Sequence, residues 1–310
     1  MRKASLIKIL VTGGAGFIGS QVSRLLLEAD HQVVVLDNLK TGHKNAVPKG
    51  AKLIEGDIAD SQKTKLALKD VDAVIHMAGL IVVSESVKYP QKYFENNVLG
   101  TVNLLESMKD TGVKKIIFSS SACVYGEAKK LPITEDAPLA PDNPYGATKA
   151  SVEAFIQSYH AIYGFDATIL RYFNPYGPGE LHDPETHVIP NFIKATLAKK
   201  PIPLYWKGEQ IRDFIYVEDL ARAHIDVLKL SGFNIFNLGM EKGVKIKDLI
   251  EMIFKIVGRQ VPINDLGQRP GDVHASFASS KKLQKAIGWQ AKVSLTEGLR
   301  RTIEYFSRLD

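Results

Sequence analysis

The stretch Leu6-Ile7-Lys8-Ile9-Leu10-Val11-Thr12-Gly13-Gly14-Ala15-Gly16-Phe17-Ile18-Gly19 decides the fold, because an apolar run leads into a glycine-rich turn. Apolar residues then recur between Val22 and Leu27 at the spacing of one helix face. Gly13 permits a tight turn, Gly16 lets the backbone approach a diphosphate, and Gly19 allows the helix to pack closely on the strand. The free amides and positive potential of the helix N-terminus favour phosphate groups. The stretch therefore predicts a strand, a phosphate-binding turn and a helix.

A carboxylate follows the next apolar run. His31-Gln32-Val33-Val34-Val35-Leu36 is typical of a second strand, and it ends in Asp37, 24 residues after Gly13. A carboxylate at this place accepts hydrogen bonds from the ribose hydroxyls of an adenosine and repels a 2′-phosphate. The pattern therefore predicts NAD as the cofactor rather than NADP.

Further strand-like runs alternate with helical patterns through the first half of the chain. Residues 51–55 lead to Gly56-Asp57-Ile58, residues 71–76 lead to Met77-Ala78-Gly79, and residues 113–118 lead to three serines. This order predicts an α/β fold with a Rossmann-type doubly wound parallel sheet. Ligands bind such sheets outside the carboxyl ends of the strands, where each of these motifs falls.

After Arg171 the composition changes to loops rich in Pro, Gly and aromatic residues, with shorter elements. This change predicts a smaller α/β substrate-binding domain. We expect the Rossmann domain to cover residues 1–173 and the smaller domain residues 174–310, with residues 214–240 packing back onto the first.

Composition excludes several classes of protein. The 310 residues include 45% hydrophobic and 24% charged residues, enough for a full core, and no apolar run approaches the ~18 residues that span a bilayer. A single cysteine, Cys123, excludes a disulfide within the chain and fits the cytoplasm. The net charge of +6 is scattered, so we expect no nucleic-acid partner and no membrane partner. The eight histidines are dispersed, so we also expect no metal site.

Tyr145 and Lys149 are four residues apart in Tyr145-Gly146-Ala147-Thr148-Lys149, after Pro144 at an expected helix start. Residues at this spacing share a helix face, so the ammonium can favour the phenolate and make the phenol a usable general base. Alone, such a pair is usually a solvated helix face. The nucleotide turn upstream and Ser121, at the end of a strand, favour a catalytic role in chemistry at a carbinol carbon.

With these motifs the chain resembles the extended short-chain dehydrogenase/reductase superfamily, and within it the NAD-dependent nucleotide-sugar epimerases typified by UDP-galactose 4-epimerase. The resemblance runs nearly end to end. The matching segments are residues 12–19, 37–38, 56–58, 97–101, 119–126, 145–149, 171–175, 212–214, 269–272 and 288–305.

The resemblance implies a catalytic set of Ser121, Tyr145 and Lys149. Tyr145 would take the proton from the sugar 4-hydroxyl, Lys149 would hold the nicotinamide ribose and lower the pKa of Tyr145, and Ser121 would relay the proton. The 4-keto sugar would turn over in the pocket before its reduction, so that NAD is regenerated. A homodimer through the helices of residues 88–109 and 143–163 is also implied.

Binding residues follow from the motifs and the resemblance together. The expected NAD contacts are Gly13, Gly16, Phe17, Ile18, Gly19, Asp37, Asn38, Asp57, Ile58, Ala78, Gly79, Asn97 and Lys149. The expected contacts to a UDP-sugar are Ser121, Tyr145, Asn174, His187, Arg212, Arg269 and Ser276.

Three positions depart from the family pattern. Ile81 stands where UDP-galactose epimerases often have a lysine near the cofactor diphosphate, which implies weaker NAD retention. Trp206-Lys207-Gly208 replaces a common Gly-Asp-Gly near the base. Ser276 stands where some relatives have a tyrosine, so the pocket is expected to admit UDP-N-acetylhexosamines as well as UDP-hexoses.

Other functions on the same scaffold stay open. A 4,6-dehydratase needs an Asp-Glu pair where this chain has Ala122-Cys123, and a decarboxylase needs a glutamate, whereas Glu127 lies beyond the Tyr-Gly turn. An NADP-linked keto-sugar reductase conflicts with Asp37. A UDP-glucuronate 4-epimerase and a non-catalytic NAD-binding module also fit the scaffold, and the intact tyrosine and lysine disfavour the latter.

Overall fold

The computed structural model describes residues 6–181, 187–268 and 273–309. The chain divides into two compact units, each made of three segments. The first comprises Met1–Val124, Pro141–Arg171 and Ala221–Phe236, and the second comprises Tyr125–Ala140, Tyr172–Leu220 and Asn237–Asp310. The domain boundary expected after residue 173 stays a prediction.

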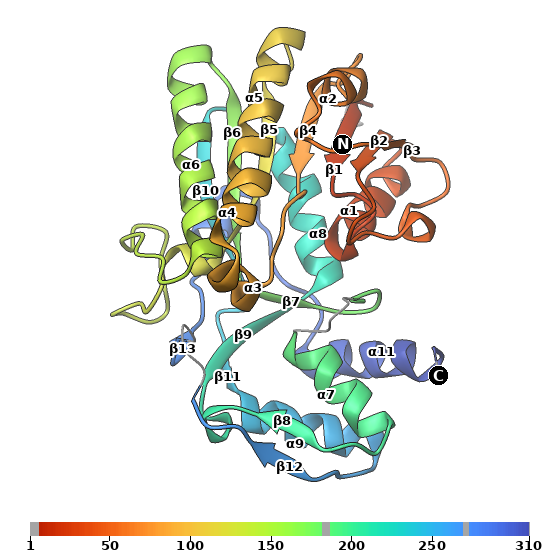
Figure 1. The fold of residues 1–310 in the computed structure, drawn as a ribbon, viewed down its shortest axis with the longest axis vertical. Coiled ribbons are helices and arrows are strands. Elements are labelled where there is room, and N and C mark those ends of the chain that lie inside the picture. The colour runs from red at the N-terminus through yellow and green to blue at the C-terminus, as the bar shows by residue number, and fades with distance from the viewer. Residues whose placement is uncertain (1–5, 182–186, 269–272, 310) are drawn as a thin grey trace. The chain divides into compact units, whose positions relative to one another are not determined.

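A seven-stranded sheet organises the first unit, with the strand order β10-β6-β5-β4-β1-β2-β3 (Figure 1). Pairing is parallel from β5 through β4, β1 and β2 to β3. The predicted α/β Rossmann-type fold is therefore confirmed. The strands are β1 (Lys8–Thr12), β2 (Gln32–Asp37), β3 (Lys52–Glu55), β4 (Ala73–His76), β5 (Lys115–Ser121), β6 (Asp166–Tyr172) and β10 (Phe233–Leu238).

Helices connect these strands, and α5 and α6 lie side by side (Figure 1). Ile9, Leu10 and Val11 of β1 are fully buried, as expected of a parallel strand whose two faces are both covered. The helices are α1 (Phe17–Glu28), α2 (Ser61–Ala67), α3 (Val83–Lys88), α4 (Pro90–Tyr93), α5 (Gly100–Thr111) and α6 (Pro144–Tyr163). Short helical turns lie at Lys44–Ala46 (η1) and Ala122–Val124 (η3), and a π-helix, η2, spans Phe94–Leu99.

In the second unit, β9 (Ile211–Tyr216) is the central strand. It pairs in parallel with β7 (Asn174–Tyr176) and β13 (Ala275–Ser276), and antiparallel with β11 (Gly243–Lys245). A separate parallel pair joins β8 (Ile202–Leu204) to β12 (Ile263–Asp265). The helices of this unit are α7 (Val188–Leu197), α9 (Ile246–Val257), α10 (Lys281–Ile287) and α11 (Leu295–Ser307), with the turn η4 (Trp206–Gly208). Helix α8 (Val217–Asp226) begins in the second unit and ends in the first, which also holds the turn η5 (Val227–Lys229).

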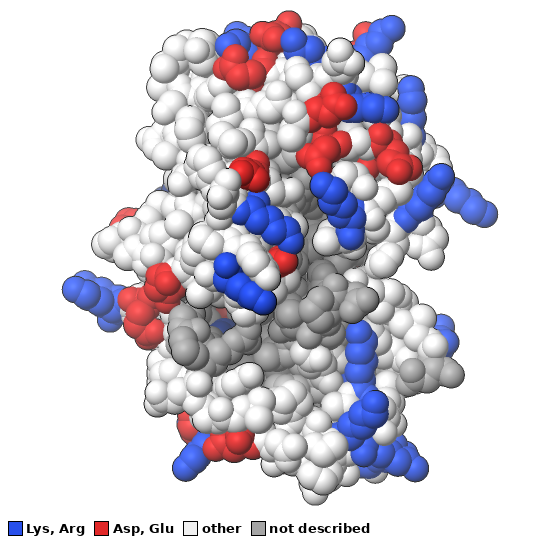
Figure 2. Space-filling model, in the orientation of Figure 1, with Lys and Arg blue, Asp and Glu red and all other residues white. Residues whose placement is uncertain are grey.

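Charged side chains are spread over the surface, and many oppositely charged ones lie next to each other (Figure 2). Arg24 pairs with Glu28, and Lys65 pairs with Asp110. Such exposed pairs contribute little to stability, about 0 to 1 kcal/mol each. Within the described residues, none of the helices has the length and apolar character needed to cross a membrane.

Candidate active site

The glycine turn between β1 and α1 is formed by direct contact of backbone with backbone. Gly13 has a φ of 71°, and a Cβ there would lie 2.7 Å from the Ala78 nitrogen. A Cβ on Gly19 would lie 2.2 Å from the Gly13 oxygen, so neither position admits a side chain. A Cβ on Gly16 would meet only the Gly13 oxygen, at 3.3 Å, among the described atoms. The fold itself has room for a side chain at position 16. The glycine there instead leaves space for a ligand that binds at the turn.

The N-terminus of α1 is available to an anion. Gly16 is its N-cap residue, and no side chain in the described structure caps the first turn. The amides of Phe17, Ile18 and Gly19 therefore point out of the helix without an intrahelical acceptor. These amides and the positive potential of the helix N-terminus favour a diphosphate, so the turn suits the predicted dinucleotide.

Asp37 lies at the carboxyl end of β2 and is held in place by two backbone amides. Its Oδ2 accepts from Ala15 at 3.0 Å and its Oδ1 from Leu39 at 2.9 Å. Each carboxylate oxygen has a second lone pair for a ribose hydroxyl. This arrangement fits NAD, as the sequence predicts.

Asn38 and Asp57 are brought together beside Asp37, at the ends of β2 and β3. The Asn38 amide donates to Asp57 Oδ2 at 2.8 Å, and Lys40 lies 3.4 Å from the same oxygen. Burial raises the pKa of Asp57, but hydrogen bonds from Ala59 and Asn38 and the charge of Lys40 together hold it below its ordinary value. Ile58 is 4% exposed and lies against Gly100, where a Cβ would come within 2.9 Å of it.

Asn97 joins the loop after β4 to the helix that carries Tyr145. Its side chain accepts from the Leu80 amide at 2.8 Å and donates to the Leu80 oxygen at 2.9 Å and to Thr148 Oγ1 at 3.1 Å. A Cβ on Gly79 would lie 3.3 Å from Asn97 Oδ1 and 3.8 Å from Lys149 Nζ. The predicted residues Gly79, Asn97 and Lys149 are therefore neighbours.

The start of α6 presses against the η3 turn that follows β5. A Cβ on Gly146 would lie 2.4 Å from the Cys123 oxygen, so only glycine fits between the two segments. The Tyr145 amide also donates to Ser86 Oγ at 3.1 Å. Ser121, at the end of β5, lies near the Tyr145 phenol and partly opposes the rise of its pKa. The structure thus brings Ser121, Tyr145 and Lys149 together.

Lys149 is 4% exposed. Its Nζ donates to the Ser119 oxygen at 2.7 Å and lies 4.8 Å from the centre of the Phe118 ring and 5.9 Å from that of Tyr145. Burial lowers the pKa of Lys149 to about 8 and raises the pKa of Tyr145 well above its ordinary value. Burial therefore favours the protonated phenol, and the charge of the Lys149 ammonium acts against this preference.

In the second unit, Asn174, Arg212 and Ser276 lie around β9. Asn174 donates to the Asp213 oxygen at 2.9 Å, and Ser276 pairs with Arg212 in the sheet register. The Arg212 guanidinium donates to the backbone oxygens of Ile211 and Val273 at 2.9 and 2.8 Å. These bonds hold a planar cation that suits a phosphate.

His187 lies outside this sheet, at the residue before α7. Its Nδ1 is 2.6 Å from Glu180 Oε1, so the side chain faces a buried carboxylate of the same unit. The predicted phosphate contact Arg269 lies outside the described residues.

Two structural residues of the site were not predicted. Ser86 holds the Tyr145 amide, and no sequence pattern near Ser86 indicates it. Asp213 is fully buried and accepts from the amides of Met240 at 2.8 Å and Ala278 at 3.1 Å. Burial raises the pKa of Asp213 to about 6. Its position between Arg212 and Phe214 in a strand could have indicated a structural role for Asp213. A charged residue inside a strand is rarely buried unless other groups bind it.

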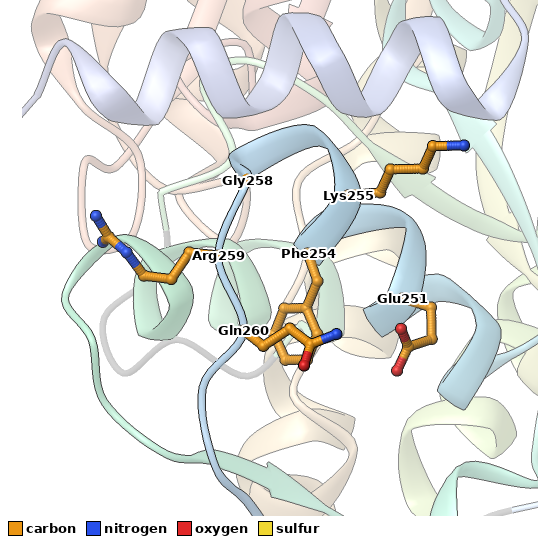
Figure 3. Close-up of a pocket in the computed structure, with 6 residues that line it drawn as sticks. All are labelled: Glu251, Phe254, Lys255, Gly258, Arg259 and Gln260. Carbon is orange, nitrogen blue, oxygen red and sulfur yellow. The ribbon is translucent and has the colours of Figure 1, made fainter.

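A separate open depression, with a volume of about 310 Å³, lies at the end of α9 (Figure 3). Lys255 and Arg259 point away from each other there. None of the residues predicted for catalysis or binding is among its lining residues, which are Glu251, Phe254, Lys255, Gly258, Arg259 and Gln260. The depression is therefore not the candidate active site.

The chain is similar to known proteins along most of its length. A model of the NAD dependent epimerase/dehydratase family matches residues 9–239. The UDP-glucose 4-epimerase of Corynebacterium glutamicum is 40% identical over 300 residues, covering 91% of this chain and 90% of the relative.

Solved structures are similarly close. The UDP-glucose 4-epimerase of Thermotoga maritima, solved with UDP-glucose, has a TM-score of 0.94 at 35% identity and covers 98% of this chain and 99% of its own. The UDP-N-acetylglucosamine 4-epimerase of Methanobrevibacter ruminantium, solved with UDP-N-acetylmuramic acid, has a TM-score of 0.94 at 35% identity, with coverages of 99% and 100%.

Two glycine substitutions separate folding from cofactor binding. Gly19→Ala places a Cβ 2.2 Å from a backbone oxygen, so the free energy of unfolding should fall by about 1 to 3 kcal/mol or more. Gly16→Ala should lower it by less than about 1 kcal/mol but weaken NAD binding at least about tenfold, because the methyl group occupies the cradle. Urea denaturation and calorimetric titration with NAD measure the two effects. Equal NAD affinity in Gly16→Ala and the native protein would contradict the assignment of the turn.

Proposed function

The chain belongs to the NAD dependent epimerase/dehydratase family, and on this premise we propose that it interconverts UDP-hexoses at C4, with NAD as its cofactor. The observation that carries the proposal is that Ser121, Tyr145 and Lys149 lie near one another inside the unit that holds the glycine turn and Asp37. Tyr145 supplies an acid/base group and Lys149 a cation, while the glycine turn and Asp37 supply a cradle for the cofactor. Oxidation at a carbinol carbon requires these three parts.

NAD, when bound, supplies the redox chemistry by accepting hydride from C4 of the sugar and returning it. Gly13, Gly16 and the first amides of α1 would hold its diphosphate, and Asp37 would hold the adenosine ribose. Gly79, in the loop after β4, and Asn97, which binds that loop, lie next to Lys149. They would therefore contact the nicotinamide half of NAD. The remaining predicted contacts are Asn38, Asp57, Ile58 and Ala78.

Tyr145 would remove the proton from the sugar 4-hydroxyl, through or beside Ser121. Burial raises the pKa of the phenol, and the Lys149 ammonium lies on the same helix face. The charge of that ammonium favours the phenolate at the moment of proton transfer. The same phenol returns the proton after the keto sugar has turned over, so the residue serves both directions.

The substrate-binding residues proposed in the second unit are Asn174, His187, Arg212, Arg269 and Ser276. Arginine fits phosphate oxygens with two parallel hydrogen bonds, so Arg212 and Arg269 are assigned to the diphosphate. Ser276 is small where some relatives have a tyrosine, so the sugar pocket is proposed to admit an N-acetyl group. A relative that acts on UDP-N-acetylglucosamine supports this wider substrate range.

A homodimer in the cytoplasm completes the proposal. Large apolar side chains are exposed on neighbouring helices of the first unit, including Leu99 at 49%, Phe155 at 40% and Ile162 at 70%. On α6 the positions 147, 151, 154, 155, 158 and 162 are all exposed, and their spacing places them on one face. This face combines apolar residues with two small polar ones, in the order Ala147, Ser151, Ala154, Phe155, Ser158 and Ile162. An exposed face of small and apolar residues is typical of a helix that packs against a partner. The single cysteine supports the cytoplasmic location.

A 4,6-dehydratase or a decarboxylase on this scaffold is disfavoured, because Ala122 and Cys123 supply no acid after Ser121. A UDP-glucuronate 4-epimerase would use the same catalytic set, and only its substrate tells it apart.

Proton NMR of the anomeric region tests the function directly. Incubation with UDP-galactose or UDP-N-acetylgalactosamine, with and without added NAD, should yield the gluco epimers. Tyr145→Phe should reduce turnover by about a hundredfold to ten-thousandfold, because the general base is lost, while NAD binding and the urea midpoint stay unchanged. If the native protein converts neither sugar even with NAD, the proposal fails for these substrates. If Tyr145→Phe turns over normally, the role of the phenolate is wrong.

Ser276→Tyr tests the width of the sugar pocket. The added ring should cut kcat/KM for UDP-N-acetylgalactosamine at least about tenfold more than for UDP-galactose, because only the former carries the bulky group. Ser276→Ala is the control and should leave both values close to native. An equal loss on both sugars in Ser276→Tyr would contradict the assignment.

The dimer is tested by sedimentation velocity. Leu99→Asp combined with Phe155→Asp should convert a dimer of two 34.2 kDa chains into a monomer, because two charges would be buried at the contact. Leu66→Asp is a matched control, since Leu66 is 57% exposed on α2. A monomeric native protein, or a double variant that stays dimeric, would show that this face is not the interface.

A further inference from the structure

A buried cluster of charges lies on α6, one helical turn beyond Lys149. Glu153 is 4% exposed and Arg171, on β6, is 2% exposed. The Arg171 guanidinium donates to both carboxylate oxygens of Glu153, from Nε to Oε1 at 3.0 Å and from Nη2 to Oε2 at 2.6 Å. A full ion pair is thus enclosed within the first unit, although the proposed reaction assigns no role to either residue.

The cluster fixes α6 on the strand that ends in the catalytic serine. The Ser120 hydroxyl donates to Glu153 Oε1 at 2.5 Å, while Lys149 Nζ donates to the oxygen of the adjacent residue, Ser119, at 2.7 Å. Two successive turns of α6 are therefore held by two successive residues of β5. The next residue of that strand is Ser121, which faces Tyr145.

Stability alone is a weak reason for such a pair. Removing two charges from water is costly, and buried ion pairs can often be replaced by apolar residues of similar volume without loss. The cost is more readily understood if the carboxylate acts on something nearby. Residues four apart on a helix are neighbours on its surface, so the closest cation on α6 is Lys149.

We infer that Glu153 is a positioning residue of the reaction, whose carboxylate keeps Lys149 cationic and holds α6 in the place where Tyr145 meets Ser121. Arg171 and Ser120 keep that carboxylate ionised by satisfying its oxygens. The inference rests on the proposed function, because it gives Glu153 a task in the same chemistry.

The surroundings of Lys149 agree with this role. Burial lowers the pKa of Lys149, whereas the charges of Glu153 and Cys123 raise it, so the value of about 8 is a balance. On the side of β4, His76 is fully buried, with its pKa lowered to about 3 by burial and by Lys149, and it adds no charge. The titratable and charged groups around Lys149 are Tyr145 and Glu153 on α6, His76 on β4, Cys123 in η3 and Arg171 on β6.

The sign of the effect follows from these neighbours. In Glu153→Gln the opposing negative charge is lost and the Arg171 charge remains, so the pKa of Lys149 should fall further. Lys149 would then lose its proton at a lower pH. Since the cation favours the Tyr145 phenolate, activity on the alkaline side should fall with it. Glu153→Asp keeps the negative charge, so the activity of this variant on the alkaline side should stay close to native.

The experiment compares the native protein with Glu153→Gln and Glu153→Asp by two readouts. The first is the ¹³Cε shift of Lys149 in protein with ¹³C-labelled lysine, assigned by its absence in Lys149→Met and followed from about pH 6 to 10. The second is the pH profile of kcat/KM for UDP-galactose. Glu153→Gln should lower the midpoint of the Lys149 titration and the alkaline midpoint of the kcat/KM profile, each by about one pH unit. Glu153→Asp should lower both midpoints by much less.

Each outcome decides a different point. Equal lysine midpoints in all three proteins, or a larger shift in Glu153→Asp than in Glu153→Gln, would overturn the inference. A shifted lysine with an unchanged kcat/KM profile would overturn its catalytic part. If the native protein shows no turnover, the proposed function fails, while the lysine titration still decides whether Glu153 sets the charge of Lys149. If Glu153→Gln does not fold, Glu153→Asp decides the inference, since a native lysine midpoint supports it and a lowered one overturns it.

Discussion

The contact of Gly13 with the loop after β4 is the constraint on which the rest of the first unit depends. The backbone of the turn lies so close to Ala78 that no side chain fits between them. Thr12, the residue before the turn, accepts through its hydroxyl from the amides of Met77 at 3.2 Å and Ala78 at 3.3 Å. The carboxyl ends of β1 and β4 are therefore fastened together, and α1 must begin at that edge with its free amides facing outward.

A directed chain of hydrogen bonds carries this constraint to the catalytic helix. Because the Thr12 hydroxyl accepts from two amides, it donates its proton to His76 Nδ1, 2.7 Å away. The neutral His76 then carries its proton on Nε2 and donates to Thr101, which donates to the Asn97 oxygen. Asn97 in turn binds Leu80 and Thr148 on α6. The nucleotide turn and the Tyr145 helix thus share one polar network, although their sequences are far apart.

Sequence patterns predict the parts of this unit whose physical cause is local. The glycine turn, the apolar strands and the helix start at Pro144 follow from neighbouring residues, and the structure has a helix starting at that proline. Ahead of α5, six residues around Asn97 form a π-helix. Nothing local indicates that widening, since the Asn97 side chain is bound by Leu80 and Thr148. Ser86 and Glu153 were missed for the same reason, because their partners are distant in sequence.

The two units differ in how many substitutions their structures tolerate. In the first unit the glycines and the Tyr145–Lys149 pair are held by backbone contacts that allow few substitutions. In the second unit, Trp206 has a φ of 53° and Lys207 one of 50°, in a region that favours glycine. The buried Trp206 indole nitrogen has no hydrogen-bond partner among the described residues. A bulky residue there is strained where the family often has glycine, and Lys207 puts a kink into the turn η4 that Trp206 begins. Because the reacting groups lie in the first unit, the second can change at such positions, and substrate choice can vary while the redox step stays the same.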